Sequence, residues 1–262
     1  MQGCAVYNKL PGRGCGQMSR THVSVTSLYY DPVKIKVREM SGKDLLPVKF
    51  LIMTNGSYGD LNWYREQQTD SFDRIICVDG GAGRARALGL IPAWVVGDLD
   101  SIRDGDRRYM EMTGVRFKTF PRQKNHTDTQ LALELSAEQG AKKIVVWGGT
   151  GTRLDHTLSN IFSAVALLEQ GIDVLFDSPG VTVYLIRDRL VLPGSVGDTV
   201  SLIALGEKAH GVNLQGFHYP LQDAVLESRW QWAVSNVITN THPVVQVDSG
   251  VLAVFHYKIL TP

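Results

Sequence analysis

Short apolar runs alternate with helix-length stretches from Lys49 to Phe176, and this alternation constrains the fold more than any other feature. Runs with the composition of buried strands occupy residues 50–53, 74–78, 94–96, 115–120, 143–147 and 174–176. Helical stretches lie between them, at residues 61–67, 84–88, 103–112, 127–139 and 154–168. Strands that alternate with helices are typical of a mostly parallel sheet with right-handed crossovers. We therefore predict an α/β, Rossmann-like domain over residues 48–179.

Two of the expected helices carry further signals. Thr127 and Gln130 have the spacing of a capping box, which places a helix start at Thr127. In the longest stretch, apolar residues recur with a helical period over four turns. They are Leu154, Leu158, Ile161, Phe162, Val165 and Leu168.

The pattern changes near Pro179, where the helical periods end. Apolar runs with strand character follow at residues 181–187, 199–205, 210–214, 234–238, 244–247 and 251–257. Turn signals separate them, and residues 248–250 (Asp-Ser-Gly) are expected to form a hairpin loop. We predict a second, all-β domain over residues 180–262, built as a small sandwich.

Residues 1–47 contain glycine, proline and serine without sustained periodicity, and we expect a poorly ordered N-terminal extension. The net charge of +1 favours neither nucleic acid nor a membrane as a partner. No apolar run approaches the roughly 18 residues of a membrane span. Three cysteines make no disulfide framework, which fits a reducing compartment. A cytoplasmic location is therefore expected.

An acidic stretch follows the third predicted strand. Asp98 and Asp100 stand two residues apart where the run Trp94–Val96 passes into a loop. Open α/β sheets bind ligands beyond the carboxyl ends of their strands. Mg²⁺ sites commonly use one or two carboxylates together with substrate phosphates. Two solvated acids at a strand end are the simpler alternative.

Other polar residues stand at predicted strand ends or helix starts. Asp79 precedes two glycines, which by themselves indicate only a tight turn. Asp128, in the first turn of a helix, is explained either by the helix dipole or by a metal ion. The Gly148–Gly151 segment is similar to a phosphate-binding loop but lacks the Lys-Ser/Thr ending of a P-loop. No GxGxxG fingerprint opens a helix, so a dinucleotide-dependent dehydrogenase is not favoured.

Several segments together resemble one enzyme family. The sequences VDGGAGRARALGL, PAWVVGDLDSI and NHTDTQLALELSAEQGAKKIVVWGGTGTRLDHTLSN, followed by VSN and SGVLAVF, are similar to the bacterial form of the thiamine pyrophosphokinase family. The resemblance extends from about Lys49 to the C-terminus. It implies an α/β domain followed by a β-sandwich, and a homodimer. It also implies Mg²⁺-dependent transfer of a diphosphoryl group from ATP to the hydroxyl of thiamine, giving thiamine diphosphate and AMP.

The resemblance also implies roles for individual residues. Catalysis is expected from Asp98, Asp100, Asp128 and Asp155, and the first three are expected to hold Mg²⁺. ATP binding is expected from Asp79, Gly148, Gly149, Arg153, Asp155 and His156. Thiamine binding is expected from Lys124, Ser235 and Asn236.

Three questions stay open at this point. Asn125 stands where family members often carry an acid: either a metal or water contact is lost there, or the position is peripheral. Trp230 and Trp232 are either thiamine contacts or sandwich core. Asp100 or Asp155 could orient the attacking alcohol or take its proton. The alternative functions are a related pyrophosphokinase for another alcohol, such as a hydroxymethyl pterin, and a non-catalytic nucleotide-binding module.

Overall fold

The computed structural model describes residues 48–67, 69–122, 125–151 and 153–259, and the expected extension lies outside them. The helices are α1 (Leu61–Arg65), α2 (Gly81–Ala87), α3 (Asp104–Met112), α4 (Asp128–Glu138) and α5 (Leu154–Glu169). The first six strands are β1 (Lys49–Met53), β2 (Arg74–Val78), β3 (Trp94–Gly97), β4 (Arg116–Thr119), β5 (Lys143–Trp147) and β6 (Asp173–Asp177). Each of these elements was expected from the sequence, with small differences at its ends.

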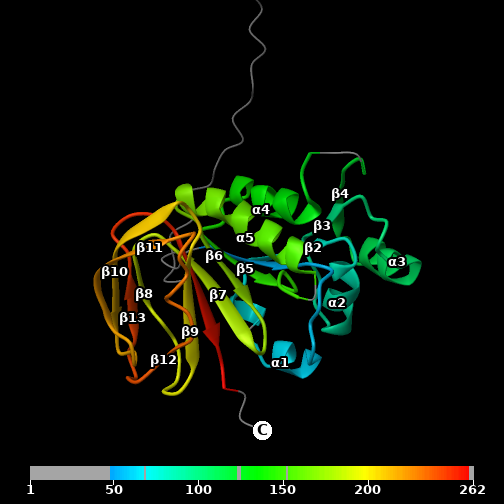
Figure 1. Ribbon diagram of the computed structural model, residues 1–262. Coiled ribbons are helices and arrows are strands. Elements are labelled where there is room, and N and C mark those ends of the chain that lie inside the picture. The colour runs from blue at the N-terminus through cyan, green and yellow to red at the C-terminus, as the bar shows by residue number, and fades with distance from the viewer. Residues whose placement is uncertain (1–47, 68, 123–124, 152, 260–262) are drawn as a thin grey trace, which may run out of the picture. The chain divides into compact units, whose positions relative to one another are not determined.

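The first six strands form a parallel sheet in the order β4-β3-β2-β1-β5-β6. The chain builds outward from β1 in one direction through β4, and then returns to place β5 on the other side of β1 (Figure 1). A crevice opens where the strand order reverses in this way, beyond the carboxyl ends of the two central strands. The topology therefore directs attention to the loops that follow β1 and β5.

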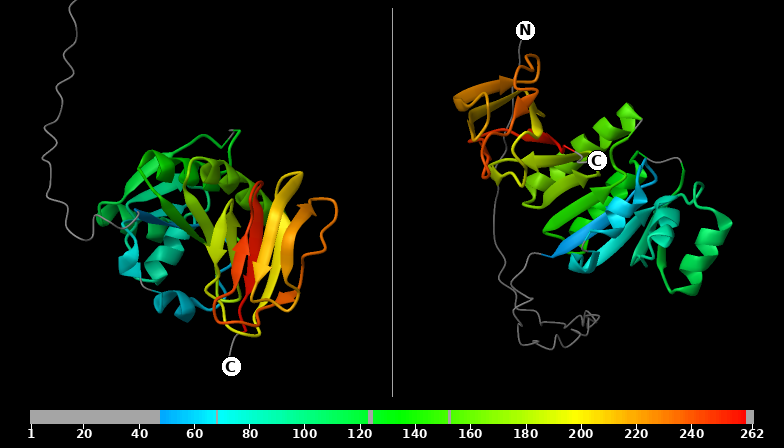
Figure 2. Two further views of the ribbon diagram at one scale, coloured as in Figure 1. Left: turned by 90° about the vertical axis from the view of Figure 1, so that its left-hand side faces the viewer. Right: turned by 90° about the horizontal axis from the view of Figure 1, so that it is seen from below.

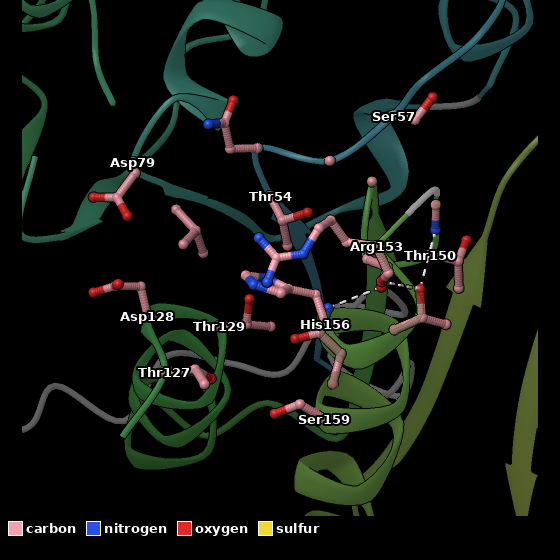
Figure 3. A pocket seen from close by; sticks show the side chains of 18 of the residues that line it. Thr54, Ser57, Asp79, Thr127, Asp128, Thr129, Thr150, Arg153, His156 and Ser159 are labelled. Atoms are coloured by element: carbon pink, nitrogen blue, oxygen red, sulfur yellow. Dashed lines mark hydrogen bonds between the residues drawn. The ribbon is translucent and has the colours of Figure 1, made fainter. Parts of the chain in front are cut away.

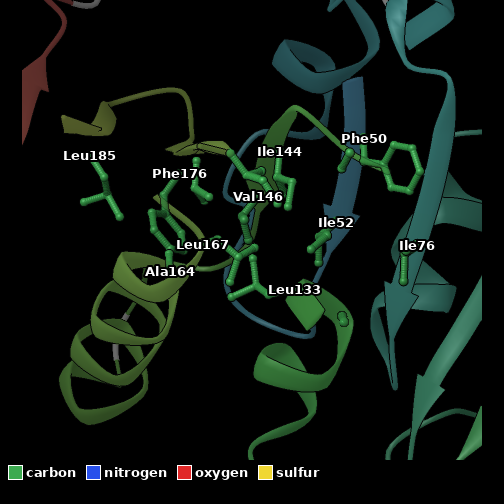
Figure 4. Close-up of a cluster of buried hydrophobic side chains, with 14 of the residues drawn as sticks. Phe50, Ile52, Ile76, Leu133, Ile144, Val146, Ala164, Leu167, Phe176 and Leu185 are labelled. Atoms are coloured by element: carbon green, nitrogen blue, oxygen red, sulfur yellow. The ribbon is translucent and has the colours of Figure 1, made fainter. Parts of the chain in front are cut away.

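Helices cover both faces of the parallel sheet because its strands are apolar on both sides. Helices α4 and α5 pack on one face, over a core that includes Ile52, Val146 and Phe176 (Figure 4). Helices α1, α2 and α3 lie on the opposite face, over Met53, Val95 and Trp147. Thr127 caps α4 as the capping-box spacing predicted, accepting a hydrogen bond from the Gln130 N–H at 3.2 Å.

The second half of the chain is all β, as expected. Its strands are β7 (Val181–Ile186), β8 (Arg189–Val191), β9 (Thr199–Ala204), β10 (Lys208–Gln215), β11 (Leu221–Glu227), β12 (Asn236–Val237), β13 (Val244–Gln246) and β14 (Leu252–Tyr257). Strand β7 pairs antiparallel with β6, and β14, β9 and β12 continue the first sheet beyond it, each antiparallel to the strand before it. Figure 2 shows β7, β14 and β9 side by side. A second sheet, in the order β11-β10-β13-β8, packs against them to complete a sandwich. A domain boundary near residue 179 remains a prediction, because strands on both sides of it share one sheet.

Two sequence expectations need correction. Residues 248–250 do not form a hairpin loop, because β13 belongs to the four-stranded sheet and β14 to the large one. The loop crosses between the two layers instead. Strands β8 and β11 were not expected, since β11 carries polar residues on most of its exposed positions.

No helix among the described residues has both the length and the apolar content needed to cross a membrane.

Candidate functional site

A cavity of about 730 Å³ lies at the reversal of strand order (Figure 3). Its walls come from the loops after β1, β2 and β5 and from the first turns of α4 and α5. The lining residues include Thr54, Asn55, Ser57, Asp79, Ser101, Thr127, Asp128, Gly148, Gly149, Arg153, Asp155 and His156. The structure thus brings all six residues expected to bind ATP, together with Asp128, to one cavity.

Backbone contacts hold the two central loops against each other. The Thr54 N–H donates to the Trp147 carbonyl at 3.0 Å, and the buried Tyr58 hydroxyl contacts both the Thr54 and Trp147 carbonyls. A Cβ atom on Gly56 would stand 1.9 Å from the Gly148 carbonyl oxygen, so only glycine permits this approach. The floor of the cavity is therefore fixed by interactions that do not involve a ligand.

Helix α5 directs its N-terminus at the glycine-rich loop. Asn160, in its second turn, is buried and donates from Nδ2 to the Gly149 carbonyl at 2.8 Å. The Gly151 N–H donates to Thr157 Oγ1 at 3.2 Å. The unsatisfied N–H groups and positive end of a helix favour an anion such as phosphate. Asn160 was not expected from the sequence, where it appears as one polar residue in an amphipathic helix.

Asp79 follows β2 in a strained conformation, with a φ angle of 44°. Its Oδ1 atom accepts a hydrogen bond from the Leu99 N–H at 3.0 Å. The carboxyl packs so closely on Gly97 that a Cβ there would stand 1.8 Å from Oδ1. Asp79 therefore links the loop after β2 to the acidic loop after β3.

Burial raises the pKa of the Asp79 carboxyl to about 6. The Leu99 N–H opposes the shift, whereas the charges of Asp128, Asp98 and Asp100 add to it. These three carboxylates therefore lie close enough to Asp79 to repel its ionised form. The sequence-based expectation that acids converge at this edge of the sheet has electrostatic support.

Replacing Asp79 with asparagine should flatten the pH dependence of stability. The folded-state pKa of Asp79 lies above the unfolded value of 3.8. The free energy of unfolding is therefore higher at low pH, where the carboxyl is protonated, and falls as pH rises through about 6. The loss should be roughly 2 kcal/mol between pH 4.5 and 7.5. Asparagine keeps an acceptor for Leu99 and tolerates positive φ. Denaturant unfolding at both pH values tests this, and parallel stability curves for the two proteins would contradict it.

Asp98 and Asp100 lie beside the cavity but are not among its lining residues. An unexpected residue, Arg122, pairs with both: its Nη2 lies 2.5 Å from Asp100 Oδ2 and its Nε 3.8 Å from Asp98 Oδ2. Arg122 follows β4, which is the parallel neighbour of β3. Among the residues that the structure describes, no three His, Cys, Asp or Glu side chains form a preformed metal site.

Arg153 and Asp155 form a bidentate pair at the start of α5, with Nε 3.0 Å from Oδ1. This hydrogen bonding lowers the pKa of the exposed Asp155 carboxyl below its ordinary value. His156 lines the cavity next to the pair (Figure 3). The pair uses Nε and Nη2 of Arg153, so a guanidinium with five N–H donors keeps others for a phosphate oxygen.

Of the residues expected to bind thiamine, Ser235 and Asn236 do not line this cavity. Ser235 and Asn236 lie at the start of β12, and Lys124 lies outside the described residues. Asn236 is buried and its amide is used within the chain, contacting both the N–H and the carbonyl of Tyr219. Trp230 and Trp232 are exposed, so neither belongs to the sandwich core.

Comparison with known proteins matches both halves of the chain. Residues 66–176 match the family model described as "Thiamin pyrophosphokinase, catalytic domain", and residues 189–252 match "Thiamin pyrophosphokinase, vitamin B1 binding domain". A thiamine pyrophosphokinase of Bacillus subtilis (strain 168) is 28% identical over 195 residues, which are 70% of this chain and 87% of that protein.

Solved structures agree. The Bacillus subtilis thiamine pyrophosphokinase has a TM-score of 0.71 at 25% identity, covering 81% of this chain and 100% of that one. The Geobacillus thermodenitrificans thiamin pyrophosphokinase has a TM-score of 0.68 at 21% identity, covering 82% and 99%, and supports the fold alone. With family models matched in both halves and a relative matched over most of its length, the chain belongs to the thiamine pyrophosphokinase family, as its motifs predicted.

Proposed function

We propose that the cavity between β1 and β5 binds ATP and transfers its terminal diphosphoryl group to the hydroxyl of thiamine, giving thiamine diphosphate and AMP. The observation that carries this is the convergence of Asp79, the acidic loop after β3 and the α5 N-terminus, in a chain of this family. A pterin pyrophosphokinase and a non-catalytic module are not favoured, since both family models are those of thiamin pyrophosphokinase.

The phosphates of ATP occupy the positive end of α5. The Gly148–Gly151 loop allows close backbone approach, and Asn160 holds that loop to the helix. Arg153 supplies a guanidinium, which binds phosphate oxygens in the same bidentate manner as it now binds Asp155. Together these groups hold the β-phosphorus in place for attack by the alcohol.

Magnesium fits the donor set of the acidic loop. Asp98 and Asp100 carry hard oxygen ligands, and Asp128 and Asp79 add negative charge within interaction range. Two carboxylates and substrate phosphates are enough for Mg²⁺, so a preformed cluster of three is not required. When bound there with ATP, the ion would offset charge on the phosphate oxygens.

The two carboxylates considered for activating the alcohol differ in their surroundings. Asp155 lies beside Arg153 at the start of α5, where the phosphates of ATP are placed. Asp100 belongs to the acidic loop that is proposed to hold Mg²⁺, and it pairs with the exposed side chain of Arg122. We therefore assign to Asp100 the orientation of the thiamine hydroxyl.

A product assay tests the function. The purified chain, incubated with Mg²⁺, ATP and thiamine, should release AMP and thiamine diphosphate in equal amounts. Omitting thiamine should abolish AMP release, and a hydroxymethyl pterin should not replace it. Release of ADP instead of AMP would contradict a diphosphoryl transfer.

A homodimer is supported by exposed apolar surface. Helix α5 presents Leu154, Leu158 and Phe162 to solvent at intervals of four residues, beginning between Arg153 and Asp155 of the cavity. Exposed Trp230 and Trp232 lie in the β region. Apolar patches on a soluble protein commonly mark interfaces. Ser235 and Asn236 would then reach the thiamine site from a second copy.

The cysteine content also bears on location: the buried Cys77 thiol is compatible with the cytoplasm.

Replacing Leu158 with aspartate should convert the dimer into a folded monomer and lower activity at least tenfold, because a charge would be buried in the interface. Size-exclusion chromatography with light scattering measures the mass, and circular dichroism checks the fold. Met112→Asp is the matched control, since Met112 is an exposed apolar residue at the end of α3. A Leu158→Asp protein of unchanged mass would argue against this interface.

A further inference from the structure

Arg122 lies beside the proposed metal ligands but has no role in the reaction outlined above. It lies three residues beyond β4, and the register pairs Gly97 of β3 with Thr119 of β4. The two loops that follow these strands therefore run side by side. This brings the guanidinium of Arg122 onto the carboxylates of Asp98 and Asp100, at 3.8 and 2.5 Å.

The ion pair is well placed to break. The Arg122 side chain is 79% exposed, whereas that of Asp98 is 16% exposed. Exposed ion pairs are weak because water and salt screen them. A divalent cation has twice the charge and prefers carboxylate oxygens, so it competes directly with the guanidinium for both acids. The displaced side chain stays tethered beside the cavity.

A guanidinium released at this point would meet phosphate. Arginine binds phosphate oxygens through a planar fork of N–H donors. Diphosphoryl transfer also spreads negative charge over the oxygens of the transferred group. We propose that Arg122 is a transferable counter-cation: it neutralises Asp98 and Asp100 until Mg²⁺ takes them, and then pairs with the phosphates of ATP. This inference rests on the function proposed above.

Two binding measurements on Arg122→Gln test the proposal. Calorimetric titration with Mg²⁺ alone should show binding about three- to tenfold tighter than in the wild type, because no ion pair must be broken first. Titration with α,β-methylene-ATP at saturating Mg²⁺ should show binding at least about fivefold weaker, because a charge-assisted contact is lost. Arg122→Lys should fall between the two proteins in both titrations.

Arg107→Gln is the matched control. Arg107 is an exposed arginine that pairs with Glu111 on α3, so its loss changes the net charge equally without touching the acidic loop. It should leave both affinities unchanged. Weaker or unchanged Mg²⁺ binding by Arg122→Gln would overturn the proposal, and so would unchanged binding of the analogue. Failure of the proposed function would appear separately, as a wild-type chain that makes no AMP from ATP and thiamine.

Discussion

Replacing Asp100 with asparagine should lower kcat by at least about a hundredfold, on the scale of losing one electrostatic stabiliser of a transition state. Asparagine has nearly the same shape, so the change removes a charge and leaves the loop intact. The charge has two uses in the proposed reaction: it provides a metal ligand, and it orients the attacking hydroxyl. The measurement is AMP release at saturating ATP, thiamine and Mg²⁺.

Stability separates this expectation from a structural role. Asp100 contributes an exposed ion pair with Arg122, which is worth about 0–1 kcal/mol. Its removal also relieves repulsion with Asp79, whose pKa should fall toward its ordinary value. The two effects oppose each other, so the free energy of unfolding without ligand should change by less than about 1 kcal/mol. A destabilised protein with intact kcat would show that Asp100 is structural.

Asp70→Asn is a suitable control for the loss of one negative charge. Asp70 lies in an exposed 3₁₀ turn and is not among the residues that line the cavity. Its replacement should leave kcat unchanged. A similar fall in both variants would attribute the effect to net charge and not to the position of Asp100.

Much of this site could be predicted because the sequence shows where the strands end. Apolar runs locate the strands, and in a parallel sheet their carboxyl ends meet at one edge. This rule predicts that Asp79, Gly148 and the acids after β3 lie near one another. The family motifs then supplied substrate and chemistry that periodicity alone does not contain.

Other features depend on long-range pairing and could not be read in the same way. No local pattern shows that β7 pairs with β6 and so joins the sandwich to the α/β sheet. Arg122 lies in a polar loop, and its importance appears only once β4 is known to lie beside β3. The helical period of α5 predicted the helix correctly. The period did not show that Leu158 faces solvent. It identifies a helix with many apolar residues, but it does not tell which of them pack on the sheet and which remain exposed.

Asn236 shows how a residue matched to a family motif can also be structural. Its Oδ1 accepts from the N–H groups of Tyr219 at 3.0 Å and Val237 at 2.9 Å, and its Nδ2 donates to the Tyr219 carbonyl at 2.7 Å. An amide has two acceptor sites and two donors. These three bonds leave one N–H group of the amide unused, and the residue is only 5% exposed within this chain.

Asn236→Ala should therefore destabilise the protein by about 2–4 kcal/mol, since three hydrogen bonds are lost and backbone groups of Tyr219 are left without partners. Denaturant unfolding measures this. Ser235→Ala is the informative comparison, because Ser235 is exposed and it is its backbone N–H that bonds to Ser201. That change should leave stability nearly unaltered.

Kinetics then distinguish binding from folding. If the Ser235 hydroxyl contacts thiamine, Ser235→Ala should raise KM for thiamine about three- to tenfold and leave KM for ATP unchanged, because a hydrogen bond to one substrate is lost. Asn236→Ala should raise the same KM, but with a lower melting temperature. If Asn236→Ala proved fully stable, its contacts with Tyr219 would not hold the β12 region in place. If Ser235→Ala changed both KM values equally, the β12 residues would act on the whole site and not on thiamine.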